Sequence, residues 1–213
     1  METAKAGVEE GEEGDFVEHL FTASSHVWLM FFTNTGRVYV ERVHEIPDMG
    51  RAAKGRSIAN ILELRAEENI KALVRVSAVY GANKEDQTWQ QSQELFFVTR
   101  LGTVKRTSLN EFQNVRKGGI IAVNLDEGDY LIGAALTDGQ HDVMLFSDGG
   151  KAVRFDENDV RPLGRQARGV RGMMLEESQS VIAMLVAEDE TQSVLTATEN
   201  GYGKRTSITE YTR

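Results

Sequence analysis

The sequence predicts an all-β fold built as a propeller-like array of small antiparallel sheets. Three observations support this prediction: a hairpin pattern that occurs four times, a spacing near 50 residues, and four short strand-like runs in each full unit. The hairpin copies are WLMFFTNTGRVYVE from Trp28, LFFVTRLGTVKRT from Leu95, DVMLFSDGGKAVRF from Asp142 and SVLTATENGYGKRT from Ser193. We therefore expect about three full four-stranded repeats followed by part of a fourth.

The glycines in the hairpin turns set the period. They fall at Gly36, Gly102, Gly150 and Gly201, so the intervals are 66, 48 and 51 residues. The long first interval contains residues 82–93, a polar stretch without apolar periodicity that we interpret as an insertion. Asp148-Gly149 and Asn200-Gly201 are pairs that tolerate the positive φ of tight hairpin turns.

Each full repeat has the same order of elements. Residues 1–14, rich in Glu and Gly, are predicted to be an acidic disordered tail, and residues 15–213 hold the repeats. A hairpin is followed by a basic glycine-rich loop, a short apolar strand, a turn, and a last strand with the period of two of a half-buried strand. The repeats span about 26–76, 94–137, 142–187 and 193–213.

Composition excludes several classes of protein. The chain has no cysteine, which removes disulfides and thiolate chemistry, and no apolar run long enough for a membrane helix or a secretory signal. This composition fits a cytoplasmic protein without a membrane partner. The formal net charge of −9 argues against a nucleic-acid partner, but residues 1–15 alone carry −5 of it. Binding to a polyanion depends on where the positive charge lies.

The basic residues recur at matched positions. An arginine lies four residues after the turn glycine in three copies, and the loops between hairpin and apolar strand are also basic. If equivalent positions share one rim, they form a curved basic band suited to the phosphates of bent duplex DNA. The simpler alternative is that these side chains only solvate the surface. The candidate DNA-binding residues are Arg37, Arg51, Lys54, Arg56, Lys105, Arg106, Arg116, Lys117, Lys151, Arg154, Arg165, Arg168, Arg171, Lys204 and Arg205.

No catalytic or metal-binding cluster stands out in the sequence. His19, His26, His44 and His141 are not at ligand spacing, and the acids at 126–129 lack the other positions of a calcium loop. An enzyme therefore ranks last among the functional hypotheses, and no cofactor is expected in this chain. A propeller-like protein-interaction module without DNA binding is the alternative, favoured by the acidic total and by the insertion at 82–93.

Four motifs closely resemble the C-terminal domain of the DNA gyrase A subunit. They are GRVYVERVHEIPDMGRAAKGRSIANIL, KGGIIAVNLDEGDYLIG, VRPLGRQARGVRG and ENGYGKRTSITEY, and the resemblance extends over residues 15–213. The paralogous subunit of topoisomerase IV is the nearest competitor. The resemblance implies a β-pinwheel, in which neighbouring blades exchange a strand and a basic perimeter wraps double-stranded DNA without sequence specificity.

The resemblance also implies a place in a larger enzyme. In the family, the wrapped DNA is presented for ATP-dependent negative supercoiling. The catalytic tyrosine lies in the N-terminal part of the A subunit, whereas ATP and Mg²⁺ are bound by other domains. The implied partners are DNA, the B subunit, and the rest of the A subunit, at the nucleoid. The family's basic box QRRGGKG has no copy here and the last repeat is incomplete, so we expect a fragment that could self-associate through open end blades.

Overall fold

The computed structural model describes residues 19–50, 53, 55–76 and 93–213. Within these residues the regular elements are β-strands and short 3₁₀ turns, so the predicted all-β class is confirmed. The tail predicted at 1–14 and nearly all of the insertion predicted at 82–93 lie outside the described residues. The strands are β1 (Trp28–Thr33), β2 (Arg37–Arg42), β3 (Ile70–Val76), β4 (Glu94–Thr99), β5 (Thr103–Ser108), β6 (Ile120–Ile121), β7 (Leu131–Thr137), β8 (Asp142–Ser147), β9 (Ala152–Asp156), β10 (Val170–Arg171), β11 (Val181–Ala187), β12 (Ser193–Ala197) and β13 (Gly203–Ser207). The 3₁₀ turns are η1 (Val43–Glu45), η2 (Ile58–Asn60), η4 (Leu109–Phe112), η5 (Glu157–Asp159) and η6 (Ile208–Glu210).

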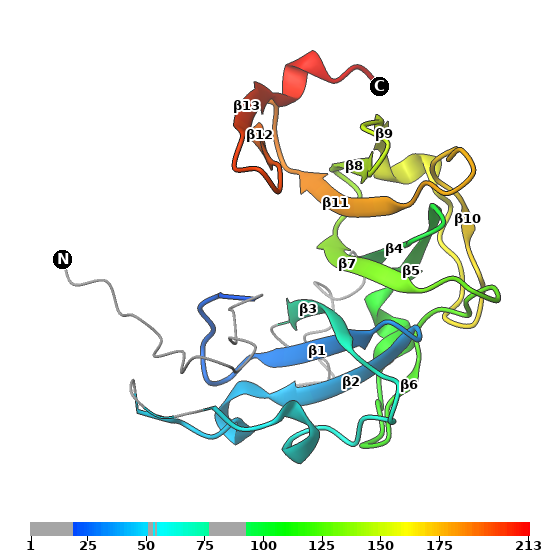
Figure 1. Cartoon of the computed structure of the whole chain (residues 1–213). Coiled ribbons are helices and arrows are strands. Elements are labelled where there is room, and N and C mark those ends of the chain that lie inside the picture. Colours follow the sequence, from blue (N-terminus) through cyan, green and yellow to red (C-terminus); the bar gives the residue numbers. More distant parts are fainter. Residues whose placement is uncertain (1–18, 51–52, 54, 77–92) are drawn as a thin grey trace.

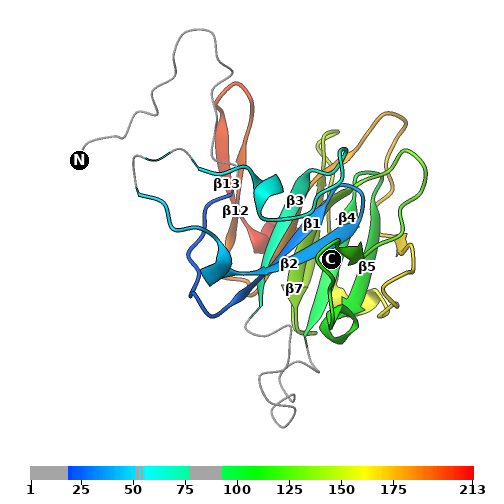
Figure 2. The same cartoon turned by 90° about the horizontal axis from the view of Figure 1, so that it is seen from below.

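The strands form four antiparallel sheets, which we call the first to fourth blades. Their strand orders are β3-β1-β2-β6, β10-β5-β4-β7, β11-β8-β9 and β12-β13. Figure 1 shows the blades following one another around an arc, with β3, β7 and β11 on its inner side and β6 and β10 on its outer edge. β7 packs against both β3 and β11. Figure 2 shows from below that the strand axes of successive blades are broadly aligned.

The fourth strand of a blade comes from the following repeat. β6 lies in the second repeat of the sequence but pairs with β2 of the first blade, with Arg37 opposite Ile121. β10 of the third repeat pairs in the same way with β5 of the second blade, with Val170 opposite Val104. A repeat in the sequence is therefore not a blade in space. Among the described residues, the third blade has three strands and the fourth has two.

Hydrophobic cores lie between successive blades, and β4 contributes to two of them. Leu95 and Phe97 of β4 pack in one core with Phe32 of the first blade, while Phe96 and Val98 pack in the next core with β8. The Phe32 and Phe97 rings meet edge to face, with their centroids 5.3 Å apart. Because both faces of β4 are buried, its sequence is a continuous apolar run, and full burial of each such side chain contributes roughly 1.5–3 kcal/mol.

The hairpin turns also receive the exchanged strand. The carbonyl of Gly102 accepts hydrogen bonds from the amides of Gly172 (2.8 Å) and Met173 (3.2 Å), just after β10. Gly102 has φ +84°, and a Cβ there would lie 2.9 Å from the carbonyl oxygen of Met173. In the third hairpin the positive φ belongs to Gly150, so the prediction that Asp148-Gly149 supplies it was wrong. The carbonyl of Ser147 accepts a hydrogen bond from the Gly150 amide, so the turn is one residue longer than the two-residue turn expected.

The described part of the chain contains no helix with the length and apolar character needed to cross a bilayer.

Candidate nucleic-acid interface

The basic residues singled out in the sequence separate into two main groups in the structure. Residues of the first group are largely buried and bind groups of the protein, and we call them the anchor cations: Arg37, Lys105, Arg106 and Arg154. Residues of the second group are exposed on or beside the loops that lead to the exchanged strand, and we call them the loop cations: Arg56, Arg116, Lys117, Arg168 and Arg171. Arg51 and Lys54 lie outside the described residues. Lys151 and Lys204 are exposed, as is Arg205, and Arg165 is half-buried.

Lys105 is the most deeply buried anchor cation, with 1% of its surface exposed. Its Nζ donates hydrogen bonds to the carbonyls of Ala122 (2.8 Å), Arg165 (2.5 Å) and Ala167 (3.1 Å). Burial and, to a smaller extent, the charge of Arg165 lower the pKa of Lys105 to about 8, while Glu111 opposes the shift. The ammonium therefore holds protein carbonyls and faces away from solvent.

Arg37 has the equivalent function in the first blade. Its Nη2 donates to the carbonyls of Gly118 (2.6 Å) and Gly119 (2.8 Å), in the loop before β6. Its Nε lies 3.5 Å from the carboxylate of Glu68, which also accepts a hydrogen bond from the Tyr39 hydroxyl at 2.5 Å. Burial opposes ionisation of Glu68, but these donors and the amide of Arg65 hold its pKa below its ordinary value.

Arg106 and Arg154 tie each hairpin to the 3₁₀ turn of the next repeat. Arg106 pairs with Glu94 (2.9 Å) and donates to Oδ1 of Asn158 on η5 (2.8 Å). Arg154 pairs with Asp142 (2.5 Å) and donates to the carbonyls of Ile208 and Tyr211 at η6 (3.1 and 3.2 Å). The arginines that recur four residues after the turn glycine therefore join blades together. Arg205, their counterpart on β13, is exposed.

The carboxylate partners of these arginines were not among the residues predicted from the sequence. Glu94 and Asp142 each open a hairpin twelve residues before the arginine they bind, and this repeated spacing could have revealed them. Burial opposes ionisation of Asp142, but hydrogen bonds from Arg213 and Arg154 outweigh it and hold its pKa below its ordinary value. Burial raises the pKa of Glu94, and Arg106 opposes this effect.

All of the loop cations except Arg56 lie beside the exchanged strands, at the outer edge of the arc. Arg116 and Lys117 precede β6, in a turn that contains Asn114 at φ +67° and Gly119 at φ +66°. Arg168 precedes β10 and Arg171 forms part of it (Figure 1). Since β6 and β10 occupy equivalent edges of successive blades, the loops that carry these cations are equivalent, although the cations stand at different positions within them. Arg56 precedes η2 in the first repeat.

Two of the exposed cations have acidic partners. Arg168 lies 2.8 Å from Asp126, and Lys151 lies 2.6 Å from Glu176. The hydrogen bond from Lys151 lowers the pKa of Glu176. Exposed ion pairs contribute little to stability and exchange readily with other ions, so these cations remain open to an external anion.

One group with metal-ligating side chains does come together, contrary to the impression from spacing alone. Asp138, His141 and Glu157 each place one ligand atom within 4.8 Å of the others. Glu157 already accepts hydrogen bonds from the amides of Gly139 and His141, both at 2.9 Å, and one of its oxygens lies 3.8 Å from Arg106. The group is therefore engaged in the joint between the second and third blades.

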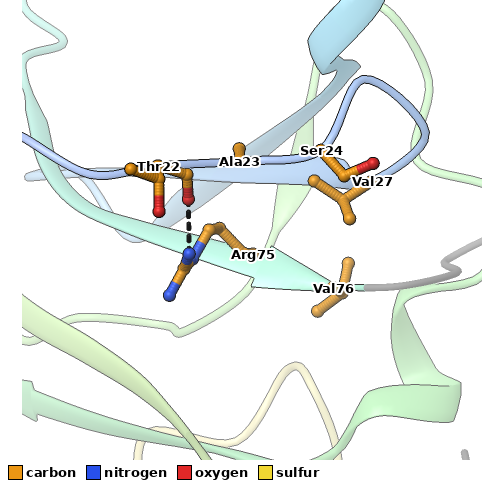
Figure 3. A pocket seen from close by; sticks show the side chains of 6 residues that line it. All are labelled: Thr22, Ala23, Ser24, Val27, Arg75 and Val76. Atoms are coloured by element: carbon orange, nitrogen blue, oxygen red, sulfur yellow. Dashed lines mark hydrogen bonds between the residues drawn. The ribbon is translucent and has the colours of Figure 1, made fainter.

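A cavity of about 560 Å³ opens beside the first blade. It is lined by residues 22–24, by Val27, and by Arg75 and Val76 at the end of β3. Figure 3 shows the Arg75 guanidinium directed at the carbonyl of Thr22, to which it donates a hydrogen bond. The lining residues include no carboxylate, histidine or other general base, so the cavity does not suggest a reaction.

Comparison with known proteins gives a consistent result. The family model described as "DNA gyrase C-terminal domain, beta-propeller" matches residues 28–77, 93–138, 141–188 and 192–212. The DNA gyrase A subunit of Klebsiella oxytoca is 44% identical over 200 residues, covering 94% of this chain and 22% of that protein. Its counterpart in Escherichia coli K12 is 41% identical with the same coverage. The chain thus spans about a fifth of the length of these relatives.

Two solved structures share the fold. The structure of a DNA gyrase A C-terminal domain matches with a TM-score of 0.71 at 25% identity, covering 89% of this chain and 57% of that one. The crystal structure of the C-terminal domain of DNA topoisomerase IV matches with a TM-score of 0.76 at 29% identity, covering 89% and 56%. Both matches therefore extend over most of the chain.

Proposed function

The chain belongs to the family of DNA gyrase C-terminal domains, and from this membership we propose that it binds and bends double-stranded DNA along the outer edge of its blades. Binding is without base specificity, because flexible cationic side chains at an edge reach phosphates. The observation that carries the proposal is that two equivalent loops both carry exposed cations: Arg116 and Lys117 lie before β6, and Arg168 and Arg171 lie beside and in β10. Lys204 and Arg205 extend the basic surface on β13.

The proposed contacts exclude the anchor cations. Lys105, Arg106 and Arg154 direct their charge at groups within the protein, so the DNA contacts are assigned to the loop cations and the exposed Lys151. Two anchor cations contribute indirectly, because Arg37 and Lys105 hold the loops that lead to β6 and β10.

The larger activity is proposed by relationship. A domain that bends DNA would present a segment of it to the rest of a gyrase A subunit during ATP-dependent negative supercoiling, and the B subunit would be the further partner. No reaction step is assigned to residues of this chain. The protein-interaction alternative was based on the acidic total and on residues 82–93, which lie almost entirely outside the described residues, and no contact among the described residues favours it.

The proposal is tested by gel shift of the 213-residue chain on a linear duplex of mixed sequence, across a salt series. A variant with Arg116→Gln and Lys117→Gln is compared with a control carrying Arg65→Gln and Lys71→Gln, which are exposed cations outside the loops before β6 and β10. We expect the first variant to lower the logarithmic salt slope by about 0.9 for each phosphate contact that is removed. The control should keep the parent slope. Equal losses in both variants, or a parent that does not bind at low salt, would overturn the proposal.

A further inference from the structure

We propose that Lys105 is a positioning residue for the DNA-contacting loop of the third repeat, residues 163–171, although it cannot itself reach DNA. The inference rests on the proposed function, because it concerns how a residue of the second blade positions cations that are proposed to contact DNA. The loop belongs to the third repeat, whereas Lys105 stands on β5 of the second blade.

The loop is held by its backbone carbonyls. Three successive ones accept hydrogen bonds from the second repeat: those of Arg165 and Ala167 from Lys105, and that of Gln166 from Nδ2 of Asn124 at 2.5 Å. In return, Nη1 of Arg165 donates to the carbonyl of Ile121 at 2.6 Å. Arg168 follows residues 165–167 directly, so its position on the outer edge depends on these hydrogen bonds. We call the hydrogen bonds from Lys105 to this loop the grip.

Lys105 is suited to this function by its number of donors. An ammonium has three N–H groups and no acceptor, and here it faces three carbonyls, those of Ala122, Arg165 and Ala167. Loss of the proton leaves two donors and a lone pair, so one carbonyl is released. In the first blade Arg37 grips Gly118 and Gly119 in the same way, but with a guanidinium that does not titrate.

The hydrogen bonds from Lys105 to the third-repeat loop should therefore depend on pH, whereas those from Arg37 to the loop before β6 should not. The charged groups that act on Lys105 are Arg165 from the loop, which disfavours protonation, and Glu111 from η4, which favours it. The Phe97 ring lies on the remaining side, 5.9 Å from Nζ. With a pKa of about 8, Lys105 loses its proton within an experimentally accessible range. DNA affinity is expected to fall as the pH rises through about 8.

Global stability should move in the opposite direction. In the unfolded chain Lys105 keeps its proton up to about pH 10.4, so between about 8 and that value the unfolded state binds more protons than the folded state. The parent should therefore gain stability relative to Lys105→Met across this window. A lysine with only a structural function would not weaken DNA binding while the fold gains stability.

The experiment compares the parent with Lys105→Met, with the conservative Lys105→Arg, and with Lys117→Met as a matched exposed control. DNA affinity is measured by fluorescence anisotropy across salt at pH 7 and pH 9, and amide hydrogen exchange of residues 163–171 is measured without DNA. Lys105→Met should bind about 3- to 10-fold more weakly at pH 7, because the loop must be ordered on binding. Its salt slope should be unchanged, its loop amides should exchange faster, and its affinity should vary less with pH than that of the parent.

The control and the outcomes separate the two proposals. Lys117→Met should lower the salt slope by about 0.9 and leave exchange of the loop unchanged. The inference is overturned if Lys105→Met binds like the parent, or if it lowers the salt slope like Lys117→Met without faster exchange. If Lys105→Met does not fold, the Lys105→Arg variant decides the question. A DNA affinity like that of the parent at pH 7 that stays constant up to pH 9 supports a positioning function. A DNA affinity that falls between pH 7 and pH 9 as much as in the parent contradicts it. A parent that fails to bind DNA refutes the proposed function, while loop exchange still reports on the grip.

Discussion

At the scale of single residues, a few charged side chains act inside the molecule. Asp142 is 5% exposed and receives hydrogen bonds from both Arg154 and Arg213. Arg154 in turn reaches the carbonyls of η6. A carboxylate and an arginine buried together are costly to separate, because removing one leaves the other charge without a partner.

Asp142→Asn should therefore destabilise the protein at neutral pH, by about 3 kcal/mol. The folded-state pKa of Asp142 is lowered, so its contribution is present above the unfolded value near 3.9 and is lost as the pH falls through the folded value. Urea unfolding of parent and variant at pH 7 and at pH 3 checks this, with the exposed Asp159→Asn as a control. A difference that grows on acidification would contradict the assignment.

At the scale of elements, the exchanged strand depends on the turn that receives it. Gly102 combines a positive φ with a site at which a Cβ would lie 2.9 Å from the Met173 carbonyl oxygen, so no side chain fits there without a shift of the segment that follows β10. The loop cations beside β10 are positioned by the same contact.

Gly102→Ala should cost about 1–3 kcal/mol of stability because it strains the backbone and displaces the strand. Gly164→Ala is the matched control, since its Cβ would meet nothing within 4 Å and its φ is not positive. Thermal unfolding measures both, and amide exchange at residues 170–173 locates the effect. Equal melting temperatures for the two variants would show that the turn does not need glycine.

If the chain binds DNA as proposed, two acids paired with exposed cations compete with it. Asp126 pairs with Arg168, and Glu176 pairs with Lys151. These carboxylates occupy the place that a phosphate would take, so displacing them offsets part of the DNA-binding free energy.

A double variant with Asp126→Asn and Glu176→Gln should bind duplex DNA about 2- to 5-fold more tightly at low salt. The control variant, Glu127→Gln with Glu177→Gln, changes the net charge equally but removes neither ion pair. Anisotropy titrations of the two variants against the parent give the comparison. If both variants tighten binding alike, the effect is that of net charge and the ion pairs are irrelevant.

At the scale of the whole molecule, the loop cations follow a curve. The blades are arranged around an arc and β6 and β10 lie on its outer edge (Figure 1), so a straight duplex cannot touch every loop at once. Full contact requires bent DNA, and bending 20–30 base pairs costs on the order of 1–6 kcal/mol.

A duplex with a single-strand gap at its centre should therefore bind more tightly than an intact duplex of the same length, because the gap removes most of the bending cost. We expect a gain of about tenfold for a duplex of about 30 base pairs. The Arg116→Gln, Lys117→Gln variant should lose part of this gain, since it has fewer contacts for the bend to bring in. Equal affinities for gapped and intact duplexes would indicate that the chain binds DNA without bending it.

The sequence by itself determined the fold class, the number of hairpins and the places where glycine is needed. The repeated hairpin, and the period of two in the last strand of a repeat, indicate which residues form strands, because strand formation and turn geometry depend on local chemistry. The sequence also revealed the basic loops that carry Arg116, Lys117, Arg168 and Arg171, because these segments combine glycine with basic residues and lack the apolar pattern of a strand. The gyrase resemblance, drawn from local motifs, was confirmed by the family match.

Only the tertiary structure decided which cations face solvent. Lys105 and Lys117 look alike in the sequence, but Lys105 lies under the loop of the next repeat while Lys117 stands on the surface. The difference arises because each of the first two blades is completed by a strand from far along the chain, as when Val104 pairs with Val170. Contacts at that separation leave no local trace in the sequence. A residue four positions after a turn glycine is therefore buried or exposed according to which distant segment covers it.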